Sequence, residues 1–318
     1  MVGRCGRRSR RSRPPTASAS ARSCAVTDYA VLFRELAIPR LVGTPNHRKV
    51  REILKRELSA RGFVVDEHQF TGRPARALLG TPRLVEGTNL IAHRPSDRPA
   101  VRPSVWLVAH YDSKGQPIAM LLRLLGVFST LGAMIGFFFA VGPALVLLAI
   151  GALILSQNRV TDNSPGAVDN ATALVAVLMA VDQLPDARHV GVIFPDGEEF
   201  GLLGAKALEG ERAELFAGAA VVNLDGLDDV GAPVAFLHRP GKVGAAVARS
   251  LDAIRARWLP VVVDGIVLAR VAGECVTIMK GNWRTMWVVH RPQDTVTRVR
   301  LDGAAGVAAG LARVLRPA

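Results

Sequence analysis

One apolar stretch constrains the fold of this chain more than any other feature. Residues 126–155 read GVFSTLGAMIGFFFAVGPALVLLAIGALIL and contain no charged residue. The stretch lies between two polar segments, HYDS at 110–113 and GAVDNAT at 166–172, which have the residue types of a metal site. If His110 and Asp169 bind the same metal, the chain must leave and return at one place.

A pair of apolar helices satisfies this requirement. As one helix, residues 118–155 would be roughly 57 Å long, whereas one crossing of a bilayer needs about 20 residues. An odd number of crossings would separate the two halves of the site. The sequence AVGP at 140–143 offers a turn and a helix start. We therefore predict a helical hairpin with helices at Ile118–Phe139 and Pro143–Leu155.

The composition of this hairpin favours a membrane. Lys114, Arg123 and Arg159 flank its base, and its tip has no positive charge. Positively charged flanks stay in the cytoplasm. We predict a multi-pass protein of the cell membrane, inserted through residues 118–155, with a cytoplasmic catalytic domain. The alternatives are a buried pair of helices and a dimer interface.

The N-terminal segment accounts for much of the net charge of +13. The first 23 residues contain seven Arg and no acidic residue, so we predict a disordered tail over residues 1–25. We expect no nucleic-acid partner. The three cysteines, Cys5, Cys24 and Cys275, form no C-x-x-C pair, which argues against a disulfide framework or a thiolate metal site.

The rest of the chain alternates between strand and helix patterns. Apolar runs at 104–112, 189–194, 219–226 and 275–280 predict buried strands, as does TMWVVH at 285–290. Helical spacing of apolar residues predicts helices over residues 27–61, 169–184 and 301–315. Asp169 or Asn170 would cap the start of the second helix. This alternation predicts an α/β fold, a three-layer α/β/α sandwich around a central mixed, mostly parallel sheet. The catalytic domain would comprise residues 26–114 and 161–318, with residues 115–160 inserted as the apolar hairpin.

Polar side chains follow the predicted strands at the edge where α/β sheets bind ligands. Two imidazoles and three carboxylates suit zinc. Five side chains exceed the needs of one tetrahedral ion with an open position, but they fit two ions if one carboxylate bridges. The predicted ligands are His110, Asp169, Glu199, Asp225 and His290.

Two further carboxylates have predicted roles. Glu198 and Glu199 are adjacent and point in different directions, so one can bind metal while the other accepts a proton from water. Asp112, two residues after His110, is predicted to hold the other imidazole nitrogen. Each residue alone has an ordinary structural explanation, such as a helix cap or a turn. Their joint position after strands favours a site.

These segments resemble the two-zinc aminopeptidase family, whose relatives include glutamate carboxypeptidase and glutaminyl cyclase. The most specific match is DGEEFGLLGAKAL at 196–208, and WLVAHYDS, GAVDNATA, NLDG and HRPQDT occur in the family's order. The resemblance implies that one zinc binds His110 and Asp225, the other binds Glu199 and His290, Asp169 bridges both, and Glu198 is the general base.

The function implied by this resemblance is that of a zinc-dependent exopeptidase of the aminopeptidase type. A hydroxide bridging two Zn²⁺ ions would attack the N-terminal peptide bond of a peptide or small amide substrate. The alternatives are a hydrolase or cyclase acting on another small amide, and a non-catalytic membrane scaffold of the same fold. Residues 268–287 fit the family pattern least well, in the region that shapes its substrate pocket.

Overall fold

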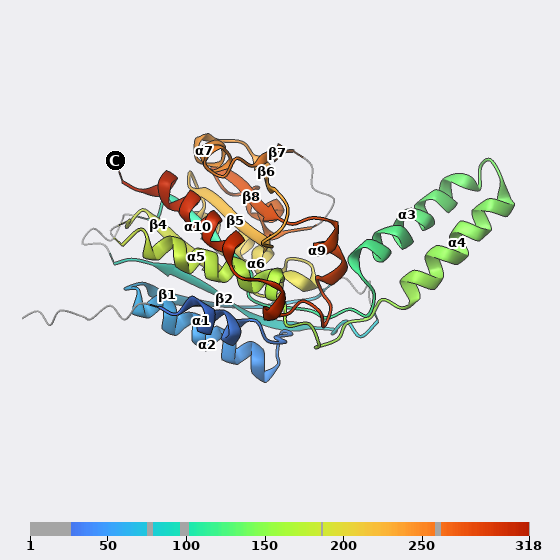
Figure 1. Ribbon diagram of the computed structural model, residues 1–318, viewed down its shortest axis with the longest axis horizontal. Helices are drawn as coiled ribbons and strands as arrows, with labels where there is room; N and C mark the ends of the chain where they lie inside the picture. The colour runs from blue at the N-terminus through green and yellow to red at the C-terminus, as the bar shows by residue number, and fades with distance from the viewer. Residues whose placement is uncertain (1–26, 75–78, 96–101, 186, 258–261, 318) are drawn as a thin grey trace, which may run out of the picture.

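The computed structural model describes residues 27–74, 79–95, 102–185, 187–257 and 262–317. The predicted disordered tail, residues 1–25, lies outside the described residues and stays a prediction. The described residues form a body of helices around a central sheet, from which one pair of helices projects (Figure 1).

Within the described residues, eight strands form one mixed sheet in the order β1-β2-β4-β3-β5-β8-β6-β7. The central strands β4, β3, β5 and β8 are parallel, while β1, β2 and β6 make antiparallel pairs. The predicted α/β fold with a mixed, mostly parallel sheet is confirmed. The strands are β1 (Val64–Gly72), β2 (Val85–His93), β3 (Val105–Val108), β4 (Val190–Phe194), β5 (Ala220–Leu227), β6 (Pro233–Arg239), β7 (Ile254–Ala256) and β8 (Glu274–Lys280).

Helices cover both faces of the sheet, and strand β3 shows why. Its side chains alternate, so Val105 and Leu107 enter one apolar core while Trp106 and Val108 enter another. A strand buried on both faces is typical of a parallel sheet between helices. The first core is completed by α1 (Tyr29–Leu36), α2 (Pro45–Ala60), α5 (Thr172–Asp182), α7 (Lys242–Ser250) and α10 (Asp302–Leu315), and the second by α6 (Leu203–Glu211) and α8 (Asp264–Leu268).

Three sequence predictions about local structure are wrong. The helical region at 27–61 is interrupted, because the Thr44 side chain caps the start of α2 and Pro45 begins it. The predicted strand at 285–290 is largely helix α9 (Trp283–Val288), which Asn282 starts through a capping box. Neither Asp169 nor Asn170 caps α5, since both lie outside helical geometry before its first turn.

The apolar stretch forms α3 (Met120–Gly136) and α4 (Val141–Ser156), which pack against each other and project from the sheet (Figure 1). The prediction of a multi-pass membrane protein is wrong. In the part of the chain that the structure describes, no helix is long and apolar enough to cross a membrane. The break after Gly136 leaves helices of 17 and 16 residues, where one crossing needs about 20. The cytoplasmic orientation depended on this insertion and has no support.

Candidate metal centre

His110 and Asp112 lie in the segment after β3, at the carboxyl end of this central strand. Both are buried. The Asp112 carboxylate accepts hydrogen bonds from the backbone N–H groups of Glu198 and Glu199, at 3.1 and 3.2 Å. Its Oδ1 also lies 3.4 Å from His110 Nδ1, but Nδ1 has no hydrogen-bond partner in the structure. Asp112 therefore fixes the turn that holds the two glutamates, a role that the sequence did not indicate.

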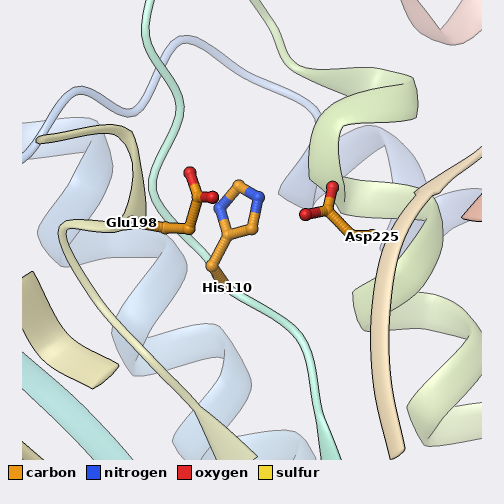
Figure 2. Close-up of side chains that lie close together, drawn as sticks. All are labelled: His110, Glu198 and Asp225. Atoms are coloured by element: carbon orange, nitrogen blue, oxygen red, sulfur yellow. The ribbon is translucent and has the colours of Figure 1, made fainter. Parts of the chain in front are cut away.

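Glu198 and Glu199 lie in a tight turn between β4 and α6. Gly197 and Gly201 flank the turn with φ of 65° and 93°, in the left-handed region that favours glycine. The backbone direction changes sharply there, so the two adjacent carboxylates reach different neighbours. Glu198 lies with His110 and Asp225, the latter at the end of β5, as Figure 2 shows.

The loop before α5 places Asp169 between the two predicted halves of the site. The Asp294 carboxylate accepts hydrogen bonds from the N–H groups of Asp169 and of the preceding residue, at 3.2 and 2.8 Å. The Asn170 side chain donates to the carbonyl of Leu224 and accepts from the N–H of Gly226. These two hydrogen bonds tie the loop that carries Asp169 to β5, at the residues on either side of Asp225.

His290 does not end a strand, as the sequence predicted, but follows helix α9 with a φ of 63°. Its Nε2 lies 2.9 Å from Asp169 Oδ2 and 3.1 Å from Glu199 Oε1. On the other side, His110 Nε2 lies 3.2 Å from Asp169 Oδ1. The two oxygens of Asp169 thus each face one imidazole, which is the arrangement that a bridging carboxylate needs.

The predicted ligands and the predicted base come together in two adjacent groups of donor atoms. Within each group the atoms lie within 4.8 Å of one another. Imidazole nitrogens with carboxylate oxygens are the donor set that suits Zn²⁺. Among the described residues, buried Glu199 Oε1 makes no hydrogen bond, although His290 Nε2 lies 3.1 Å away, as expected for two atoms that share a metal. The residues therefore fit metal ions, and the groups are His110, Glu198 and Asp225, and Asp169, Glu199 and His290.

The burial of so many carboxylates disturbs their pKa values. Burial raises the pKa of Asp225 to about 7, and the charges of Asp169 and Glu199 add to this effect. Burial acts on Glu199 in the same direction, but His290 and Lys114 outweigh it and lower its pKa to about 2. A carboxylate with a raised pKa needs a cation beside it to stay ionised at neutral pH, so the pKa values also indicate that this site requires positive charge.

His110 and Glu198 show the same competition. Burial opposes the charge on His110, but the carboxylates of Glu198, Asp112 and Asp169 outweigh it and raise its pKa well above the usual value. The pKa of Glu198 is also well above its usual range, first because of burial and then because of Asp225 and Glu199. Glu198 therefore binds a proton more readily than an ordinary glutamate does.

A cavity of about 640 Å³ opens over both groups of donors. Its walls are mainly apolar, and a few charged groups converge at its base, which is typical of a small-molecule site. Three cationic side chains, those of Lys114, Arg123 and Lys280, also line it. Lys114 Nζ lies 3.1 Å from Glu199 Oε2. Lys280 Nζ donates hydrogen bonds to three backbone carbonyl groups.

Sequence reasoning missed four residues of this site. Lys114 and Arg123 were considered only as charges at the base of the hairpin. Asp294 stands inside the HRPQDT motif, so that motif contained a signal for it. Asp264 has no motif around it. It is buried, neither carboxylate oxygen has a hydrogen-bond partner among the described residues, and burial raises its pKa to about 8.

Five other histidines lie outside the predicted site. In the described part of the chain, neither metal-binding group includes any of them. His47 is buried and its Nε2 lies 2.8 Å from Asp196 Oδ1, in the turn that precedes Glu198. The five are His47, His68, His93, His189 and His238.

Comparison with known proteins agrees with this architecture. A sequence profile of Peptidase family M28 matches residues 89–315. No curated protein matches the sequence. Among solved structures, glutaminyl cyclase from Porphyromonas gingivalis superposes with a TM-score of 0.63 at 19% identity, covering 91% of this chain and 96% of that chain.

Two peptidases are about as similar. The zinc aminopeptidase BSAP from Bacillus subtilis has a TM-score of 0.61 at 12% identity, covering 90% of this chain and 93% of its own. A leucine aminopeptidase precursor from Bacteroides thetaiotaomicron has a TM-score of 0.62 at 16% identity, covering 92% and 97%. At these identities the similarity shows a shared fold.

Proposed function

Because the chain belongs to Peptidase family M28, we propose that it is a zinc-dependent exopeptidase of the aminopeptidase type. One observation carries this proposal: two groups of metal-binding side chains lie side by side, joined through Asp169, at the base of a cavity. A non-catalytic scaffold would have no need to bury six such groups together. The structural similarity to zinc aminopeptidase BSAP supports zinc as the metal.

The geometry of the two groups supports the proposed ligands. His110 and Asp225 would hold one zinc, and Glu199 and His290 the other, with one oxygen of Asp169 directed to each. When bound, a pair of zinc ions polarises the scissile carbonyl and lowers the pKa of water. The surrounding protein keeps the ligands in place through Asp112 and Asp294, as described above.

Glu198 is the proposed general base. It lies in the same group as His110 and Asp225, so its carboxylate reaches the space where the reacting water would sit. It would take a proton from the attacking water and give it to the nitrogen of the leaving amine. Its tendency to carry a proton in this buried environment suits that transfer.

The variant Glu198→Gln tests this assignment. The amide cannot accept the proton, so we expect kcat to fall roughly 10³-fold while the purified protein keeps about two zinc ions per chain. The matched variant Glu199→Gln, one residue later in the same turn, should instead lose zinc. Full activity in Glu198→Gln would show that the assigned base is wrong, and a zinc-free wild-type protein would favour a scaffold.

A substrate panel separates the peptidase from a cyclase or another amide hydrolase. Aminoacyl arylamides and peptides with a free N-terminus should be hydrolysed, whereas the same peptides with an acetylated N-terminus should not. A peptide with N-terminal glutamine gives a direct comparison, because hydrolysis releases the free amino acid and cyclisation releases ammonia. Ammonia release without peptide hydrolysis would replace the proposed function by the cyclase.

A further inference from the structure

The segment between the two metal-site motifs forms part of the cavity wall. The side chains of Met120, Arg123, Leu124 and Val127, all on the first turns of α3, line the cavity beside the donor groups. Three of them are apolar and one is a cation. The inserted helices therefore reach the space in which a substrate would bind, at their end nearest the sheet.

A series of hydrogen bonds fixes the position of Arg123. The Gln116 side chain donates to Asn158 Oδ1 at 2.8 Å, and it accepts a hydrogen bond from Arg123 Nη1. Gln116 and Asn158 are both buried. One precedes α3 and the other follows α4, so both ends of the insertion hold the guanidinium beside the metal centre.

One edge of this guanidinium has too few acceptors. Arg123 Nε is buried and has no hydrogen-bond partner in the part of the chain that the structure describes. Nη2, on the same edge, lies 2.8 Å from His290 Nδ1, its one hydrogen-bond partner among the described residues. Two parallel N–H groups of this kind match a carboxylate, which accepts both at once.

Metal binding would take away the acceptor at Nη2. His290 Nε2 faces Asp169 and Glu199, so a metal bound there uses the lone pair of Nε2, and the proton of the neutral ring lies on Nδ1. Nδ1 is then a donor and cannot accept a hydrogen bond from Arg123. Two N–H donors 2.8 Å apart repel each other, so Nη2 then has no acceptor among the described residues and can donate, together with Nε, to a ligand.

We propose that Arg123 binds the free C-terminal carboxylate of a short peptide, so that the site prefers dipeptides. The inference rests on the proposed exopeptidase function. In a dipeptide the carboxylate lies one residue beyond the scissile carbonyl, roughly 4 Å away. Arg123 lies one imidazole ring away from the metal-binding atom of His290, which is a comparable distance. A longer peptide has a neutral amide at that position.

Binding to a variant that does not turn over tests the proposal. In a zinc-loaded Glu198→Gln protein, calorimetry should show that leucyl-glycine binds about 10- to 100-fold more tightly than leucyl-glycinamide, as expected for a charge-assisted pair. Adding Arg123→Gln should make the two ligands bind equally. Adding Arg123→Lys, which keeps the charge without the fork, should leave a smaller preference.

The control is Arg159→Gln in the same background, because Arg159 is an exposed arginine at the other end of the insertion. It should keep the full preference for the carboxylate. Equal binding of the two ligands before Arg123 is changed, a preference that survives Arg123→Gln, or no binding of either ligand would overturn the proposal. Wild-type hydrolysis of leucine p-nitroanilide, which has no carboxylate, distinguishes these failures from failure of the proposed function.

Discussion

The metal centre and the α3–α4 pair depart from the usual distribution of residues in opposite directions. At the centre, Asp112, Glu199 and Asp225 are charged and buried. In the turn that joins the two helices, Phe138 and Phe139 are 87% and 85% exposed. Globular proteins normally bury apolar side chains and expose carboxylates.

The two departures differ in how the structure compensates them. These three carboxylates each have a partner: Asp112 accepts from two backbone N–H groups, Lys114 lies beside Glu199, and Asp225 lies with His110. On the helix pair, α3 and α4 contact each other along their length, but the exposed apolar side chains have no comparable compensation among the described residues. A buried charge without compensation costs several kcal/mol, whereas an exposed phenylalanine costs little. Changes at the centre should therefore have much larger effects than changes on the helices.

Removal of the metal should have the largest effect. Dialysis against a chelator should abolish activity, because the remaining carboxylates and imidazoles cannot polarise the substrate. The free energy of unfolding should also fall, by about 4 kcal/mol relative to protein at free zinc 1,000 times its Kd. Thermal unfolding at increasing zinc concentration measures this change, together with the zinc content.

Single-ligand variants sharpen the same experiment. His110→Asn and His290→Asn each remove one imidazole from a different group, so each should lose about one zinc per chain. His93→Asn, at the end of β2 and outside both groups, should keep two. Loss of both ions or of neither from the first two variants would contradict the division into two groups.

The sequence predicted the sheet strands near the site because their apolar runs are short, buried and followed by polar residues. Strands β3 and β5 are examples. Helix α9 was predicted as a strand, since its bulky residues suggest β structure while the capping by Asn282 depends on local geometry that composition does not reveal. Strands β6 and β7, the last two at one end of the sheet, were missed, because their partly or fully exposed residues interrupt the apolar pattern.

The sequence allowed prediction of those site residues that stand in a recognisable motif. Glu198, Asp225 and His290 stand in short polar segments that end buried runs. Arg123 and Asp264 could not be predicted, because they come from an inserted helix and from a segment without a motif. Their position depends on how α3 and α8 pack against the sheet, which is tertiary information.

After removal of the metal or of its ligands, we expect the next largest effect from the buried carboxylate of Asp264, on the free energy of unfolding. Its pKa is raised by burial from the usual 3.8 to about 8. Between these values the unfolded chain releases the proton and the folded chain keeps it, so this residue's contribution to stability is present at pH 4 and is lost as pH rises to about 8. Asp264→Asn does not titrate and should escape this loss.

We expect the metal-free wild type and Asp264→Asn to be about equally stable near pH 4, since the two side chains have similar shapes. Near pH 9 the variant should be more stable, by on the order of 3 kcal/mol. Urea unfolding at both pH values measures the difference. A variant that is less stable at pH 9 would mean that the carboxylate has a cationic partner.

The smallest effects should come from the exposed surface of the helix pair. Phe138→Ser removes a side chain that is 87% exposed, so the free energy of unfolding should change by less than about 0.5 kcal/mol. Gly151→Ala is the matched contrast on the contacting surface. Its new methyl group would lie 3.0 Å from the Gly126 carbonyl oxygen and would also meet the Thr130 side chain. Because α3 and α4 would have to separate, we expect a loss of about 1–3 kcal/mol. Equal effects of the two changes in thermal unfolding would mean that the exposed surface of the helix pair is covered in solution.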